Sequence, residues 1–245
     1  MAAKDKIILA LDVSSEAEAV ELVKDLKDRV GAFKIGLELF TSAGPRIMES
    51  VRSAGAERIF FDGKFHDIPN TVAGASRAAV RMGAWMFNVH APGGTAMMRA
   101  AAEAAGDEAH RLGIQPPIIL GVTVLTSISA EVLRHELSVP VNLENQVIHL
   151  AQLTQSSGLS GVVASPQEIV AVKAACGPGF LVVTPGVRPA WASKNDQARV
   201  MTPGEAVRSG ADYIVIGRAI TAAEDKRAAA NRIVSEMEIE SAARK

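Results

Sequence analysis

The densest group of residues that could do chemistry is the run Asp62-Gly63-Lys64-Phe65-His66-Asp67-Ile68-Pro69-Asn70-Thr71. It begins where a short apolar stretch with the composition of a β-strand ends. Side chains two positions apart on a strand point to the same face, so we expect Asp62 and Lys64 to share one space. A lysine held by carboxylates stays protonated, and its ammonium group is kept in a fixed orientation, which suits a general acid. An ion pair of small value on the protein surface is the alternative for this pair taken alone.

Other polar residues stand at or just past the ends of further apolar runs. They are Asp12, Lys34, Asn88, His90, Thr126, Arg188 and Arg218. In a barrel of parallel strands, the C-terminal ends of the strands form the catalytic face. Polarity also resumes wherever a strand reaches the surface, and this explains any one of these residues alone. It does not explain charges of both signs at the same end of the strands, so we expect these side chains to converge on one site.

Eight apolar runs alternate with segments of helical periodicity, and they cover residues 6–12, 32–36, 58–62, 85–90, 118–125, 161–164, 180–184 and 213–217. Continuously apolar runs are typical of parallel strands buried on both sides. Ser15 with Glu18, Ser165 with Pro166, and Thr202 with Pro203 predict helix starts. Gly-Ala pairs at residues 55, 83 and 210 predict repeated turns from helix to strand. Eight β/α units in 245 residues favour a single (β/α)8 TIM barrel, one catalytic domain over residues 1–245. An open doubly wound sheet is the alternative.

The composition restricts the partners and the compartment. With 26 basic and 27 acidic residues the net charge is -1, which argues against nucleic acid or an anionic membrane as a partner. The single cysteine, Cys176, excludes an intrachain disulfide and a cysteine-built metal site, and it fits a reducing, cytoplasmic location. The apolar run that begins at Ile7 is interrupted at Asp12, so we expect neither a signal peptide nor a membrane span.

The run from Asp62 to Thr71 resembles the signature of the orotidine 5'-phosphate decarboxylase family, D-x-K-x-x-D followed by I-P-N-T. The similarity extends over nearly the whole chain, because further segments occur in the order of the family: Leu11-Asp12, Phe33-Lys34-Ile35-Gly36, Val122-Thr123-Val124-Leu125-Thr126-Ser127, Thr184-Pro185-Gly186-Val187-Arg188-Pro189 and Ile216-Gly217-Arg218. The chain departs from the family at Gly63, where many members have leucine. That position alternates away from Asp62 and Lys64, so we expect a difference in packing and no loss of chemistry.

The resemblance implies that orotidine 5'-phosphate loses its C6 carboxylate and becomes uridine 5'-phosphate, without metal or organic cofactor, in the last step of de novo pyrimidine nucleotide synthesis. It implies that Lys64 donates the proton and that Asp62, Lys34 and, from the partner subunit of a homodimer, Asp67 are also catalytic. The implied substrate-binding residues are Asp12, Lys34 and the partner's Thr71 at the ribose, Thr126 and Ser127 at the pyrimidine, and Arg188, Gln197, Gly217 and Arg218 at the phosphate. Backbone N–H groups at a helix start beside a guanidinium do suit phosphate. For Arg188 alone, a solvated loop charge is the alternative.

Two other functions remain open. Metal-dependent barrel enzymes that act on sugar phosphates, such as keto-gulonate-phosphate decarboxylase and hexulose-phosphate synthase, resemble this chain in their D-x-K-x-x-D strand. The I-P-N-T tail, the Leu125-Thr126-Ser127 run and the loop with Gln197 favour a pyrimidine nucleotide instead. A nucleotide-binding protein that has lost its chemistry is the non-enzymatic alternative, and the intact Asp62, Lys64 and Asp67 argue against it.

Overall fold

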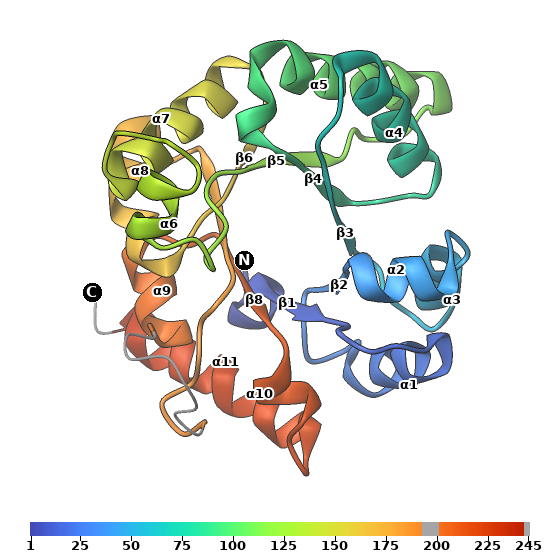
Figure 1. Cartoon of the computed structure of the whole chain (residues 1–245). Helices are drawn as coiled ribbons and strands as arrows, with labels where there is room; N and C mark the ends of the chain where they lie inside the picture. Colours follow the sequence, from blue (N-terminus) through green and yellow to red (C-terminus); the bar gives the residue numbers. More distant parts are fainter. Residues whose placement is uncertain (193–200, 243–245) are drawn as a thin grey trace.

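The computed structural model describes residues 1–192 and 201–242, and its strands close into a parallel barrel in the order β1 to β8. Figure 1 looks into this ring of strands, which the helices surround. The strands are β1 (Ile7–Ala10), β2 (Ala32–Ile35), β3 (Ile59–Phe65), β4 (Met86–His90), β5 (Ile118–Val122), β6 (Gly161–Val163), β7 (Leu181–Thr184) and β8 (Tyr213–Ile216). The predicted TIM barrel is confirmed, and the open sheet is wrong because β1 pairs with β8.

Helices follow the strands as a repeating β/α chain requires. They are α1 (Glu16–Leu26), α2 (Leu37–Ala43), α3 (Ile47–Ser53), α4 (Pro69–Arg81), α5 (Gly94–Leu112), α6 (Ala130–His135), α7 (Leu143–Ser156), α8 (Ile169–Cys176), α9 (Pro203–Ser209), α10 (Arg218–Thr221) and α11 (Lys226–Ala242), with short 3-10 helices at Ala3–Lys6, Ala91–Gly93 and Pro166–Glu168. The predicted helix starts are confirmed. Ser15 accepts a hydrogen bond from the Glu18 N–H, and Thr202 and Glu205 cap α9 reciprocally.

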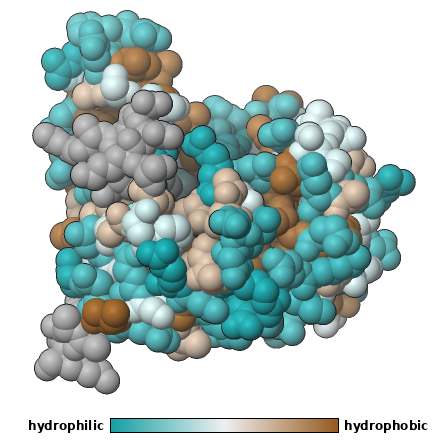
Figure 2. All heavy atoms as spheres, turned by 90° about the horizontal axis from the view of Figure 1, so that it is seen from below, coloured by the Kyte–Doolittle hydropathy of each residue, from teal (hydrophilic) through white to brown (hydrophobic). Residues whose placement is uncertain are grey.

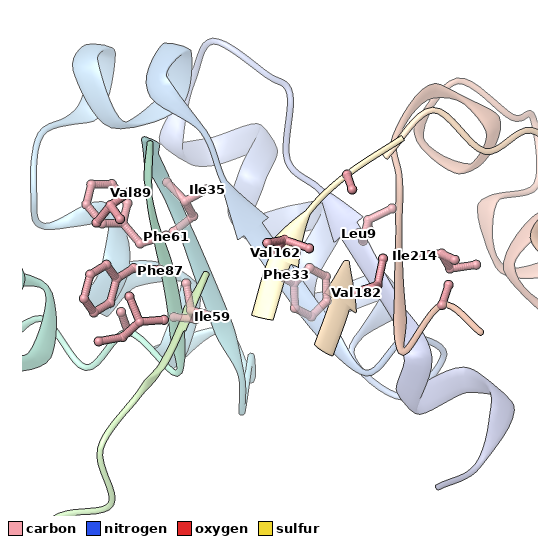
Figure 3. Close-up of a cluster of buried hydrophobic side chains, with 14 of the residues drawn as sticks. Leu9, Phe33, Ile35, Ile59, Phe61, Phe87, Val89, Val162, Val182 and Ile214 are labelled. Atoms are coloured by element: carbon pink, nitrogen blue, oxygen red, sulfur yellow. The ribbon is translucent and has the colours of Figure 1, made fainter. Parts of the chain in front are cut away.

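Alternation along the strands builds two separate cores. One fills the barrel and consists of Ile8, Ala32, Phe60, Met86, Leu120, Val183 and Tyr213. The other lies between strands and helices, where Figure 3 shows residues such as Leu9, Phe33, Phe61, Phe87 and Val182. Lys34, Asp62 and Asn88 each come two residues after a member of the inner core. Alternation therefore directs these polar side chains into the barrel, one layer nearer its C-terminal end.

Several strands are shorter than their apolar runs. β1 ends at Ala10 and β5 at Val122, although the apolar residues that follow, Leu11 and Val124, are still buried. An apolar run therefore marks burial, whereas the strand ends where the ladder of hydrogen bonds ends. As a result, Asp12 and Thr126 lie on loops just beyond their strands, where they have more freedom to turn toward the barrel axis.

Hydrophilic residues dominate the face of the molecule in Figure 2, and hydrophobic ones appear between them in small groups. Within residues 1–192 and 201–242, no helix combines the length and apolar character that crossing a membrane requires.

Candidate active site

Four charged side chains of alternating sign form a chain of ion pairs at the C-terminal ends of β1, β2 and β3. Lys34 Nζ lies 3.0 Å from Asp12 Oδ1 and 3.5 Å from Asp62 Oδ2, and Lys64 Nζ lies 2.7 Å from Asp62 Oδ1. The side chains of Lys34 and Asp62 are only 10% and 13% exposed. Asp62 is therefore not part of a surface ion pair, whereas the side chains of Lys64 and Asp12 are 29% and 58% exposed and lie at the open end of the barrel.

The carboxyl group of Asp62 is ionised despite its burial. Burial by itself raises its pKa, but the ammonium groups of Lys34 and Lys64, together with hydrogen bonds from Lys64 and Asn88, outweigh that effect and hold the pKa below its ordinary value. Asp62 is thus a fixed anion between two cations. Any group placed against this array meets charges that the fold has already oriented, without the reorganisation that water would need.

The backbone that carries Asp62 and Lys64 is irregular. Phe61 pairs with Phe87 and Phe65 with Val89, so three residues of β3 oppose Asn88 alone in β4. Lys64 has a φ of 46°, in the left-handed region that residues with a side chain rarely adopt. Asp62 and Lys64 do meet, as the sequence predicts. Regular alternation is nevertheless the wrong reason, because a bulge and a left-handed residue bring Lys64 to Asp62.

Asn88 connects the two strands at the bulge. Its Oδ1 accepts a hydrogen bond from the Lys64 backbone N–H at 2.8 Å, and its Nδ2 donates one to Asp62 Oδ1 at 2.8 Å. Sequence reasoning placed Asn88 at a strand end but assigned it no role. Both of its partners lie on the neighbouring strand, and the sequence does not contain the register between the two strands, so no sequence signal identified this role.

A cavity of about 220 Å³ opens beside the charged array. Lys34, Asp62 and Lys64 form one wall, and the rest is mostly apolar: Phe60, Val122, Val124, Leu125, Val163, Ala164, Pro185 and Val215, with Thr126 at the side. A flat ring fits between apolar walls, while a charged substituent on that ring would face the array. The low polarity of the surroundings strengthens the interaction of such a substituent with the fixed charges.

The predicted phosphate residues lie at the ends of β7 and β8. A side-chain carbon added at Gly217 would lie 3.4 Å from Asp12 Oδ2, so the Gly217 backbone passes close to the charged array. Arg218 is exposed and begins α10, which has four residues. The Arg188 N–H donates to the Met201 carbonyl at 3.1 Å. Gln197 lies outside the described residues.

The residues expected to act across a dimer do not join the site of their own chain. Residues 66–71 are all exposed, and Ile68 reaches 68% exposure. Asp67 Oδ1 accepts a hydrogen bond from the Ile68 N–H at 2.6 Å, and the ion pair of Lys64 is made with Asp62. Thr71 is exposed on the first turn of α4. Ser127 is exposed and is not among the residues that line the cavity.

Two histidines lie next to the array. The rings of His66 and His90 are 5.3 Å apart. Burial, together with the nearby His66 and Lys64, lowers the pKa of His90. In the part of the chain that the structure describes, no group of three or more His, Cys, Asp or Glu side chains is arranged to hold a metal ion.

Comparison with known proteins gives one consistent result. Residues 5–233 match the model of the orotidine 5'-phosphate decarboxylase / HUMPS family. Proteins named orotidine 5'-phosphate decarboxylase from Syntrophomonas wolfei and Moorella thermoacetica are 53% and 56% identical to this chain over 97% and 98% of its length, and the matches cover 100% and 94% of those proteins. The crystal structure of orotidine 5'-phosphate decarboxylase from Lactobacillus acidophilus superimposes with a TM-score of 0.83 at 37% identity, covering 94% of this chain and 98% of that one. The chain therefore belongs to the orotidine 5'-phosphate decarboxylase / HUMPS family.

Proposed function

We propose that this protein is an orotidine 5'-phosphate decarboxylase, a carboxy-lyase that forms uridine 5'-phosphate and CO2 without a cofactor in pyrimidine nucleotide synthesis. The observation that carries the proposal is the partly buried Lys34–Asp62–Lys64 array against an otherwise largely apolar cavity. The names of relatives that are more than 50% identical over nearly their full length support it. One catalytic domain, residues 1–245, would carry the whole reaction.

The array suits the decarboxylation of a pyrimidine at C6. As the bond from C6 to the carboxylate breaks, its electron pair stays on C6 and CO2 leaves. The Lys64 ammonium stabilises the developing carbanion and then transfers a proton to C6, forming the C6–H bond. The resulting amine regains its proton from solvent. Asp62 faces the carboxylate of the substrate, and the repulsion between the two anions is relieved when neutral CO2 departs.

The remaining side chains would bind the nucleotide around this centre. Asp12 and Lys34, joined at 3.0 Å, would hold the ribose hydroxyls. Thr126 and Ser127 would contact the pyrimidine edge, and the lining position of Thr126 supports its part of this assignment. Arg188, Gln197, Gly217 and Arg218 would bind the phosphate through guanidinium, amide and backbone N–H groups.

We also propose that the active site is completed by a second copy of the chain. Asp67 and Thr71 of the partner subunit would reach Lys64 and the ribose, and a two-fold axis makes this exchange reciprocal. The exposure of residues 66–71 supports the proposal, because it leaves the charged Asp67 and the apolar Ile68 on the surface shortly after Lys64 in the chain. We expect neither nucleic acid nor a membrane as a further partner of this homodimer. The free, buried Cys176 is compatible with the cytoplasm.

Turnover in the presence of a chelator tests the function and separates it from the metal-dependent sugar-phosphate enzymes. The protein is mixed with orotidine 5'-phosphate and excess chelator, and the pyrimidine absorbance is followed. Full activity under these conditions supports the proposal. Activity that disappears with chelator and returns with magnesium would assign the chain to the sugar-phosphate enzymes instead.

A further inference from the structure

Asn88 is a buried polar residue next to the reacting groups that the proposed mechanism does not use. It lies in the middle of β4 with 1% of its surface exposed, and its backbone pairs with Leu120 of β5. Its side chain faces the other neighbour, β3, at the bulge formed by Asp62, Gly63 and Lys64. It does not line the cavity, and both polar atoms of its side chain bind Asp62 and Lys64.

Both polar atoms of the Asn88 side chain bind residues of the charged array. The amide group donates to Asp62 Oδ1 at 2.8 Å, the same oxygen that lies 2.7 Å from Lys64 Nζ. Its carbonyl oxygen accepts from the Lys64 backbone N–H at 2.8 Å. Asparagine is the uncharged side chain of this length that combines an N–H donor group with a carbonyl acceptor. Aspartate lacks the donor when ionised, and alanine lacks both groups.

These two bonds stabilise a backbone that regular pairing cannot. The ladder between β3 and β4 is interrupted at the bulge, so the Lys64 N–H has no partner in the regular pattern. A left-handed conformation at a residue with a side chain persists only where the surroundings hold it. Asn88 supplies the missing acceptor, and so it determines the direction in which Lys64 leaves the strand. At the same time it fixes the rotation of the Asp62 carboxylate.

We propose that Asn88 is a positioning residue for decarboxylation, aligning Asp62 and the proton donor Lys64 through its side-chain amide. The inference rests on the proposed function, because it concerns the geometry of that reaction. Loss of the amide leaves the cavity walls in place but loosens the array. Transition-state stabilisation should therefore fall while nucleotide binding stays, since only groups that act in the transition state change kcat without changing affinity.

The test compares Asn88→Ala with the control Thr154→Ala. Thr154 is also fully buried, and its hydroxyl donates to the Leu150 carbonyl at 2.7 Å, away from the charged array. Asn88→Ala should lower kcat for orotidine 5'-phosphate by about 10- to 100-fold, by analogy with the removal of groups that orient metal ligands in other enzymes. KM and the affinity for uridine 5'-phosphate should stay within about threefold. Thr154→Ala should lose thermal stability and keep the kcat of the wild type.

Asn88→Asp supplies a second readout, the pH profile. The charged groups facing Asp62 are Lys34 and Lys64, with His90 close by and Asp12 beyond Lys34. The new carboxyl can donate to Asp62 only while it is protonated. The kcat of this variant relative to the wild type should therefore fall as pH rises between about 5 and 8.

The possible results separate this inference from the function on which it rests. An active wild type whose Asn88→Ala and Asn88→Asp variants keep kcat within about threefold at all pH values would overturn the inference alone. So would a parallel loss of kcat, nucleotide affinity and thermal stability, since that is the behaviour of a purely structural residue. A folded wild type with no turnover of orotidine 5'-phosphate would overturn both the inference and the proposed function.

Discussion

The most demanding prediction concerns mixed dimers of two inactive variants, Lys64→Ala and Asp67→Ala. If each site combines Lys64 of one subunit with Asp67 of the partner subunit, both homodimers should be nearly inactive. A mixed dimer then has one site with both defects and one site with neither. Random pairing makes half of the dimers mixed, and half of their sites are intact. The mixture should therefore recover about a quarter of the wild-type activity per subunit.

The structure supplies a matched control for this experiment. Asp62 lies 2.7 Å from Lys64 within the same chain, so Lys64→Ala and Asp62→Asn affect the same site of the same subunit. In a mixed dimer of these two variants, every site keeps one defect, and no activity should return. The contrast between the two mixtures distinguishes a residue supplied across the interface from one supplied within the chain.

The assay mixes the purified variants under conditions that allow subunits to exchange and follows turnover of orotidine 5'-phosphate. Exchange itself is measured with differently tagged subunits that can be isolated together. If tagged mixed dimers form and no activity returns for Lys64→Ala with Asp67→Ala, Asp67 acts within its own chain. The reasoning from the exposure of residues 66–71 is then wrong.

Three further predictions test other parts of the account. Arg188→Ala should cost about 2–4 kcal/mol of transition-state stabilisation, measured from kcat/KM, and far less on the phosphate-free nucleoside. Equal losses on both substrates would show that Arg188 does not bind the phosphate. Hydrogen bonds from Arg111 hold the pKa of Glu108 at about 2, below its ordinary 4.5. In thermal melting, Glu108→Gln should therefore be less stable than the wild type above pH 4.5, and the difference should disappear as the pH falls from 4.5 to about 2. Gly63→Leu should destabilise the fold by about 1–3 kcal/mol in denaturant titrations, because its first side-chain carbon would lie 3.0 Å from the Phe61 ring; unchanged stability would show that the rings give way freely.

The barrel was predictable from sequence because its strands are buried on both sides. Such strands appear as continuous apolar runs, and polar residues at their ends mark the catalytic face. Lys34 and Asp62 could be placed at that face in this way. The structure adds the reason that they point inward, since each comes two residues after an inner-core residue, Ala32 and Phe60 respectively.

The finer geometry could not be predicted, because it depends on contacts between strands. The left-handed backbone of Lys64 arises from the interrupted pairing of β3 with β4, and the sequence of one strand does not contain its register with the next. The role of Asn88 depends on the same register. At Gly63, the rings of Phe61 and Phe65 lie within 3.1 Å of a side-chain carbon built there, which agrees with the expected difference in packing.

The central claim is that Lys64 acts on the reacting carbon and does not hold the nucleotide. Lys64→Ala tests this most directly, with turnover of orotidine 5'-phosphate and calorimetric binding of uridine 5'-phosphate measured on the same protein. Turnover should be abolished while binding of uridine 5'-phosphate persists, because phosphate and ribose are held by other residues. Near-normal turnover of the Lys64→Ala protein would show that Lys64 is not the proton donor.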